Sequence, residues 1–149
     1  MGASGWHYAV PYQADVNAAL QHLRLEVFKA DDYYREDIDE RFAPPVDREP
    51  TLADLDDLLF SQPDSGTHSI IDIDQDVTET PESGTVSPLT TDQSREAFGT
   101  TRPTAAQVEA WAGQGGYTSY RSCYEGVYIV SYGTDGNPDQ IHFTGYSGD

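Results

Sequence analysis

The sequence predicts an α+β protein built on a mostly antiparallel sheet of about four or five strands, with helices packed on one face. Strand-like segments lie near both ends of the chain and near its middle, and several capped helical segments lie between them. The last 25 residues are typical of a β-hairpin. Separated strands and helices of this kind favour an α+β arrangement over alternating βαβ units. The length of 149 residues predicts one domain over 1–149.

The first two elements follow from residue alternation and capping. The segment "GWHYAVPY" predicts a strand with Trp6, Tyr8 and Val10 on one face and His7 and Ala9 on the other. After it, a capping aspartate predicts a helix from position 15 to about position 30. This helix carries one apolar stripe, formed by Val16, Ala19, Leu20, Leu23 and Val27.

The next segment, 31–50, is acidic and interrupted by prolines, which is typical of a mobile surface loop. A second helix is predicted from Thr51, because Thr51 and Asp54 have the spacing of a capping box. Its apolar stripe would consist of Leu52, Leu55, Leu58 and Leu59.

The stretch "THSIIDIDQDV", residues 67–77, is rich in isoleucine and predicts a strand, followed by a short edge strand at "TVSPL". Thr90 with Gln93 and Thr104 with Gln107 predict two capped helices, ended by Gly99 and Gly113. The closing hairpin would turn at 135–138. Its first strand is apolar on both sides and is therefore expected in the middle of the sheet.

Net charge is the strongest global signal, at −18. Residues 31–82 hold 17 acids against three arginines, whereas residues 1–30 are neutral. Such a field repels nucleic acid and attracts basic proteins or cations. The alternative is that the acid serves solubility alone.

We expect neither a membrane span nor a signal peptide. No apolar run is long enough to span a membrane, and the N-terminal segment lacks the pattern of a signal peptide. The single cysteine, Cys123, excludes an internal disulfide. We therefore expect a cytoplasmic protein without membrane contact.

Histidine and aspartate provide the candidate reaction centre. On a strand His68 and Asp72 share a face but lie about 13 Å apart, so a solvated acidic edge is favoured over an acid–base pair. If the first and last strands pair, His7 and His142 approach each other, with His68 as a third ligand in a metal site. These four residues define the enzymatic alternative.

Other site motifs fail on spacing. Residues 72–76 match the first acids of an EF-hand, but Val77 replaces the required glycine and Ser83 the final glutamate. The segment "GYSGD" lacks the last glycine of a serine-hydrolase elbow, and "GQGG" lacks the residues of a phosphate loop. Cys123, near Arg121, is either an activated thiol or, with greater weight, an inert one. We expect no cofactor and no dedicated metal site.

Four segments carry a family resemblance: "GWHYAVPYQ", "SGTHSIIDI", "FGTTRPTAAQVEA" and "GNPDQIHFTGYSGD". They resemble an uncharacterised family of small acidic bacterial proteins. The resemblance covers most of the chain and is weakest over 31–50 and 74–84. It implies a single intracellular domain and carries no activity or site residue.

The favoured function is a non-enzymatic acidic binding protein, an inhibitor of the immunity-protein or antitoxin type that neutralises a basic protein partner. Electrostatic steering would speed the encounter, and aromatic anchors would hold the complex. Mimicry of nucleic acid by carboxylates is a variant of this idea. The alternatives are a small hydrolase or metal-dependent enzyme using His7, His68, His142 and Asp72, and a structural subunit. The expected partner-binding residues are Asp31, Asp32, Tyr33, Tyr34, Glu36, Asp37, Asp39, Glu40, Asp54, Asp56 and Asp57.

Overall fold

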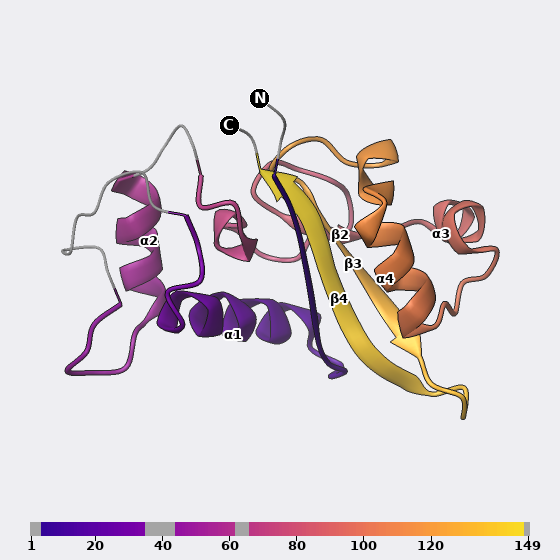
Figure 1. Ribbon diagram of the computed structural model, residues 1–149, viewed down its shortest axis with the longest axis horizontal. Coiled ribbons are helices and arrows are strands. Elements are labelled where there is room, and N and C mark those ends of the chain that lie inside the picture. The colour runs from indigo at the N-terminus through magenta and orange to yellow at the C-terminus, as the bar shows by residue number, and fades with distance from the viewer. Residues whose placement is uncertain (1–3, 35–43, 62–65, 148–149) are drawn as a thin grey trace.

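The computed structural model describes residues 4–34, 44–61 and 66–147 (Figure 1). Its helices and strands follow one another in an irregular order, and two of the helices, η2 and η3, are short 3-10 turns. The elements are β1 (Ser4–Pro11), α1 (Val16–Lys29), α2 (Leu52–Ser61), η2 (Ile70–Asp72), β2 (Val86–Pro88), α3 (Thr91–Phe98), α4 (Ala105–Gly113), η3 (Gly116–Ser119), β3 (Gly126–Tyr132) and β4 (Pro138–Ser147).

A four-stranded sheet in the order β1-β4-β3-β2 forms the centre of the molecule. Both β1 and β3 pair with β4 in the antiparallel sense, and β2 pairs with β3 in the parallel sense. The predicted α+β class and the mostly antiparallel sheet are confirmed, as is the hairpin between β3 and β4. Gly136 occupies the left-handed region in the hairpin turn, at φ 81°.

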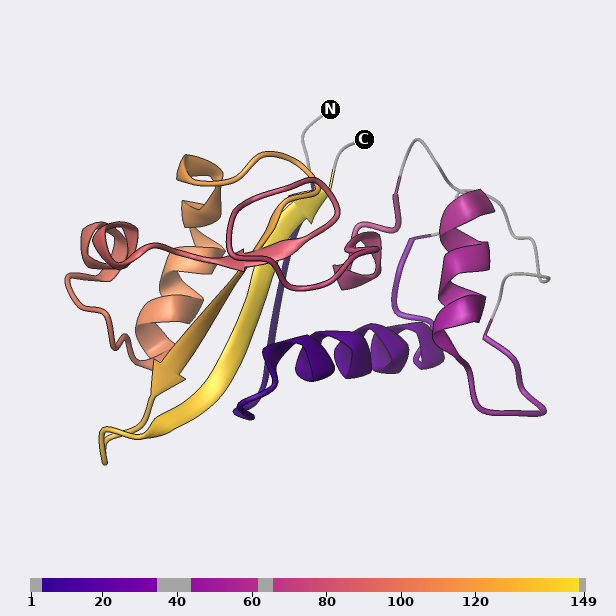
Figure 2. The same ribbon diagram turned by 180° about the vertical axis from the view of Figure 1, so that it is seen from behind.

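The helices cover both faces of the sheet, so the predicted packing on one face is wrong. Figures 1 and 2 show α1 and α2 on one side of the strands and α3 and α4 on the other. Ile141 and Phe143 point into the larger core under α1, whereas Val127 and Ile129 point into a second core with Val108 of α4. The physical reason is that the central strands are apolar on both sides, and each side must be removed from water.

Local capping starts three of the helices as predicted. The Asp15 carboxylate accepts a hydrogen bond from the Ala18 amide at the start of α1. Complete capping boxes begin α3, at Thr90 and Gln93, and α4, at Thr104 and Gln107. Because these contacts span only three residues, the sequence pattern alone specifies them.

The predicted strand over 67–77 is wrong. The segment contains η2 and only one isolated bridge, between Val77 and Val86. The Ser69 hydroxyl caps η2 by accepting from the Ile71 amide, and His68 has a left-handed φ of 54°. Instead of pairing as a strand, this turn buries three isoleucines completely, namely Ile70, Ile71 and Ile73.

The predicted acidic loop lies partly outside the described residues. Residues 31–34 and 44–50 form turns and bends between α1 and α2. None of the helices in the described part of the chain is long and apolar enough to cross a membrane.

Candidate functional site

The predicted partner-binding residues fall into three groups. Asp31, Asp32 and Tyr34 are exposed after α1, whereas Tyr33 is half-buried and its ring stacks on Phe28. Four of the acids, Glu36, Asp37, Asp39 and Glu40, lie outside the described residues. The remaining three are on α2, where Asp56 and Asp57 are exposed and Asp54 is partly buried.

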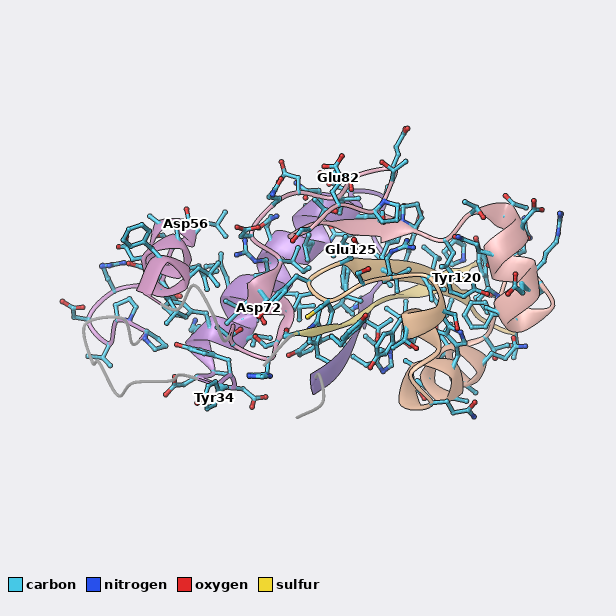
Figure 3. The ribbon with its side chains drawn as sticks, turned by 90° about the horizontal axis from the view of Figure 1, so that it is seen from above. Tyr34, Asp56, Asp72, Glu82, Tyr120 and Glu125 are labelled. Atoms are coloured by element: carbon cyan, nitrogen blue, oxygen red, sulfur yellow. The ribbon has the colours of Figure 1, made fainter. Side chains whose placement is uncertain are left out.

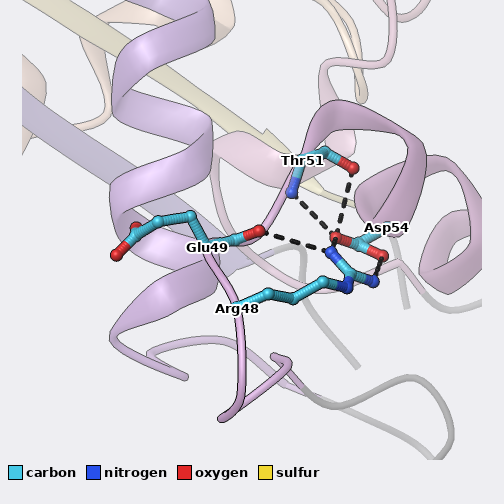
Figure 4. A network of polar contacts seen from close by, with 4 residues as sticks. All are labelled: Arg48, Glu49, Thr51 and Asp54. Atoms are coloured by element: carbon cyan, nitrogen blue, oxygen red, sulfur yellow. Dashed lines mark hydrogen bonds and ion pairs between the residues drawn. The ribbon is translucent and has the colours of Figure 1, made fainter.

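Asp54 is held by contacts within the chain (Figure 4). Its carboxylate accepts from both terminal nitrogens of Arg48, at 2.7 and 2.8 Å, and from the Thr51 amide at 2.8 Å. These hydrogen bonds, chiefly those from Arg48, hold the pKa of the Asp54 carboxyl well below its usual range. Asp54 therefore lies in the first turn of α2 and makes one of the two contacts of the predicted capping box, and its charge is already paired.

A groove lies between α2 and the segment after η2. One cavity of about 530 Å³ is lined by Asp56, Leu59, Phe60 and Asp74. An adjoining cavity of about 440 Å³ shares Leu59 and Asp74 and extends to Tyr124. We call these two cavities, with their lining residues, the α2 groove. Figure 3 shows Asp56 on α2 at one end of the molecule, far from Tyr120 at the other.

Phe60 is the largest apolar side chain at the α2 groove, and it is 89% exposed. It lies off the helix stripe because it follows Leu55 by five residues, about 140° around the axis. The predicted stripe is correct for Leu55 and Leu58, but Leu52 is 39% exposed and Leu59 is half-buried. Sequence reasoning did not single out Phe60; its position off the stripe was the available signal.

The wall of the α2 groove includes a buried carboxylate. Asp72 accepts from the Thr67 amide at 2.6 Å, from the Thr67 hydroxyl at 2.9 Å and from the Ser147 hydroxyl at 2.5 Å. Thr67 and Ser147 are fully buried. Asp72 therefore joins the turn before η2 to the end of β4, and the predicted solvated acidic face does not include it.

Arg24 of α1 lies near these acids and is only 3% exposed. It donates to the Gln21 side chain at 2.9 Å and to the Ile71 carbonyl at 3.3 Å. Burial lowers the pKa of Arg24, while nearby carboxylates, Asp56 and Asp74 foremost, raise it. Part of the negative field at the α2 groove thus stabilises a buried cation.

Of the histidines of the enzymatic alternative, His7 and His142 come together, whereas His68 does not join them. His7 Nε2 and His142 Nδ1 are 3.0 Å apart, and His142 Nε2 is 2.9 Å from the buried Ser131 hydroxyl. These three hydrogen-bonded side chains lie on the α4 face of the sheet. The approach of His7 and His142 is the one expected if the first and last strands pair. Asp72 contacts the α1 face, where His68 packs edge-on against Tyr34. The predicted cluster of His7, His68, His142 and Asp72 is therefore wrong, because the sheet separates the two pairs.

The surroundings of His7 and His142 disfavour protonation of both imidazole rings. Burial, reinforced by neighbouring His7, lowers the pKa of His142 to about 4. Burial also lowers the pKa of His7, against a smaller opposing effect of Glu109. Both rings are thus neutral near pH 7. Within residues 4–34, 44–61 and 66–147, no three His, Cys, Asp or Glu side chains are placed to hold a metal ion.

The Arg121 side chain makes hydrogen bonds to backbone oxygens. The Arg121 guanidinium is buried and donates to the backbone oxygens of Gly126, Ser87 and Pro88. It therefore joins β2 to β3. Cys123 is half-buried. The guanidinium contacts that would activate a thiolate are made instead to carbonyl oxygens.

Comparisons with protein-family models, with curated proteins and with solved structures found no match to this chain.

Proposed function

We propose that this protein is a non-enzymatic acidic binding protein that covers a basic surface of another protein through the α2 groove. The concrete form is an inhibitor of the immunity-protein or antitoxin type, with a basic toxin as partner. The observation that carries the proposal is the exposed Phe60 ring beside the carboxylates of Asp56 and Asp74.

The chemistry of the α2 groove suits a partner that presents cationic and apolar groups together. Asp56 and Asp57 project from α2, and Asp74 and Asp76 are exposed after η2. Long-range attraction by these charges speeds encounter with a basic protein, and salt weakens it. Burying the Phe60 ring would contribute on the order of 1.5–3 kcal/mol and lengthen the lifetime of the complex.

The partner must first be obtained by affinity capture from the native host at low and high salt, and then purified. We expect kinetic binding measurements on the purified pair to separate two effects. Phe60→Ser should raise the dissociation rate by roughly tenfold or more, because it removes the apolar anchor. The double variant Asp56→Asn/Asp74→Asn should instead lower the association rate and flatten its salt dependence.

Matched controls are at residues that do not line the α2 groove. Asp92→Asn/Glu96→Gln removes the same charge from the exposed face of α3, and Tyr12→Ser removes another exposed aromatic side chain. Both should bind the partner with kinetics close to those of the unmodified protein. Equal losses in the groove and control variants would contradict the α2 groove as the contact. A partner whose affinity does not change with salt would contradict the electrostatic mechanism.

A further inference from the structure

The two edge strands of the sheet, β2 and β1, differ in how far their outward main-chain groups are covered. At the β2 edge, Val77 bridges to Val86, and the Thr78 amide donates to the Val86 carbonyl at 2.8 Å. Arg121 donates hydrogen bonds to the carbonyl oxygens of Ser87 and Pro88, and Pro88 has no amide hydrogen. This edge is short and covered, as edges of folded proteins usually are.

Within residues 4–34, 44–61 and 66–147, nothing covers the β1 edge in this way. Figure 1 shows β1 in front of β4 with no other ribbon over it, and Figure 2 shows the covered edge from behind. The Tyr12 amide donates to the Asp139 carbonyl, in register with the pairing of β1 and β4. Because hydrogen-bonded positions alternate in an antiparallel pair, Trp6, Tyr8 and Val10 bond to β4. The main-chain groups of Gly5, His7 and Ala9 therefore point away from the sheet.

These outward groups make no hydrogen bond within the described part of the chain. We call them, with the outward carbonyl of Pro11, the β1 edge. We propose that the β1 edge pairs with the β1 edge of a second copy of this chain, in the antiparallel sense, to form a continuous eight-stranded sheet.

The arrangement of donors and acceptors is self-complementary about His7. A two-fold axis through His7 places Gly5 opposite Ala9 of the second copy and His7 opposite its counterpart. All three outward amides then meet outward carbonyls, and such isologous pairing is the commonest way in which identical subunits associate. Shifting the register by two residues toward the end of β1 would set Pro11 opposite Gly5, whose carbonyl would then lack an amide donor.

The net negative charge of the protein makes the pairing depend on the salt concentration. Residues 4–11 contain no Asp, Glu, Lys or Arg, whereas the acids are concentrated in 31–82. Repulsion between two chains of net charge −18 opposes association at low salt. The Debye length falls from about 30 Å at 0.01 M to about 3 Å at 1 M salt, so added salt should remove this repulsion and leave the hydrogen bonds between edges. This inference does not depend on the proposed function.

Sedimentation velocity over a concentration series at about 0.01 M and about 1 M NaCl tests the pairing. We expect a species of 16.4 kDa at low salt and a concentration-dependent species of about twice that mass at high salt. Ala9→Pro removes one outward amide without removing a bond to β4, and it should weaken dimerisation at least tenfold. Ala9→Ser retains the amide and should dimerise like the unmodified chain.

Amide hydrogen exchange in the unmodified protein gives a second readout, which holds even if Ala9→Pro fails to fold. At high salt and high protein concentration, the exchange rates of the amides of Gly5, His7 and Ala9 should fall by about tenfold relative to dilute protein in the same buffer. Those of Trp6, Tyr8 and Val10 serve as internal controls. A monomer in every condition would overturn the proposal, as would dimers whose three outward amides exchange unchanged. Protection of these amides by another protein alone would also overturn it.

Discussion

The imidazole rings of His7 and His142 lie stacked, with 5.3 Å between their centroids and an interplanar angle of 8°. One hydrogen bond joins them, from Nε2 of His7 to Nδ1 of His142 or the reverse, at 3.0 Å. That bond requires one nitrogen to accept, so it is lost when both rings are protonated. His142 is fully buried and His7 is half-buried on the face formed by β1, β4 and β3, so the pair affects stability.

Stability should therefore fall as the pH is lowered from about 6.5 to about 4. The pKa of His142 is lowered from 6.5 in the unfolded chain to about 4 in the fold, so the unfolded state binds the proton first. His142 should contribute up to about 3 kcal/mol to this loss, which levels off below pH 4. Urea unfolding of His142→Gln should show a flatter slope over this interval. His22→Gln, at an exposed position on α1, should keep the original slope.

Arg121 is expected to contribute strongly to stability. Arg121→Met should lower the free energy of unfolding by roughly 3 kcal/mol, because the carbonyls of Ser87, Pro88 and Gly126 lose their donor. Arg95→Met, exposed on α3, should change it by less than about 0.5 kcal/mol. Urea denaturation measures both. Similar values for the two variants would contradict the bracing role of Arg121.

Asp72 should act on stability rather than on binding. Asp72→Ala leaves the buried Thr67 amide and Ser147 hydroxyl without their acceptor, and we expect a loss of about 2–4 kcal/mol. Asp57→Ala removes an exposed carboxylate from α2 and should stay within about 0.5 kcal/mol of the unmodified protein. Thermal unfolding distinguishes the two outcomes. An Asp72→Ala variant as stable as the unmodified protein would contradict the structural role of the Asp72 carboxylate.

The capping box of α4 offers a local test. Thr104→Ala removes the acceptor for the Gln107 amide and should cost about 1 kcal/mol. Thr104→Ser keeps the hydroxyl and should recover most of this loss. Thr101→Ala, three residues earlier and exposed, should have little effect in the same chemical denaturation experiment. Equal stability of all three variants would show that the cap contributes nothing.

Local patterns in the sequence were sufficient for the capped helices and the hairpin. A cap joins residues three apart, and strand alternation sets which side chains share a face, so neither needs knowledge of the rest of the chain. The approach of His7 and His142 was expected only on the condition that the first and last strands pair, and that pairing is a long-range contact.

Tertiary contacts decided the rest. The isoleucine-rich segment 67–77 satisfies strand propensity, yet it turns because Asp72 bonds back to Thr67 and forward to Ser147, 75 residues away. Helices cover both faces because both sides of the central strands are apolar. Periodicity identifies the apolar sides of a strand but not the segment that buries each one. The same holds for charge: composition established an acidic protein, whereas only the folded chain distinguishes the paired Asp54 and buried Asp72 from the exposed Asp56.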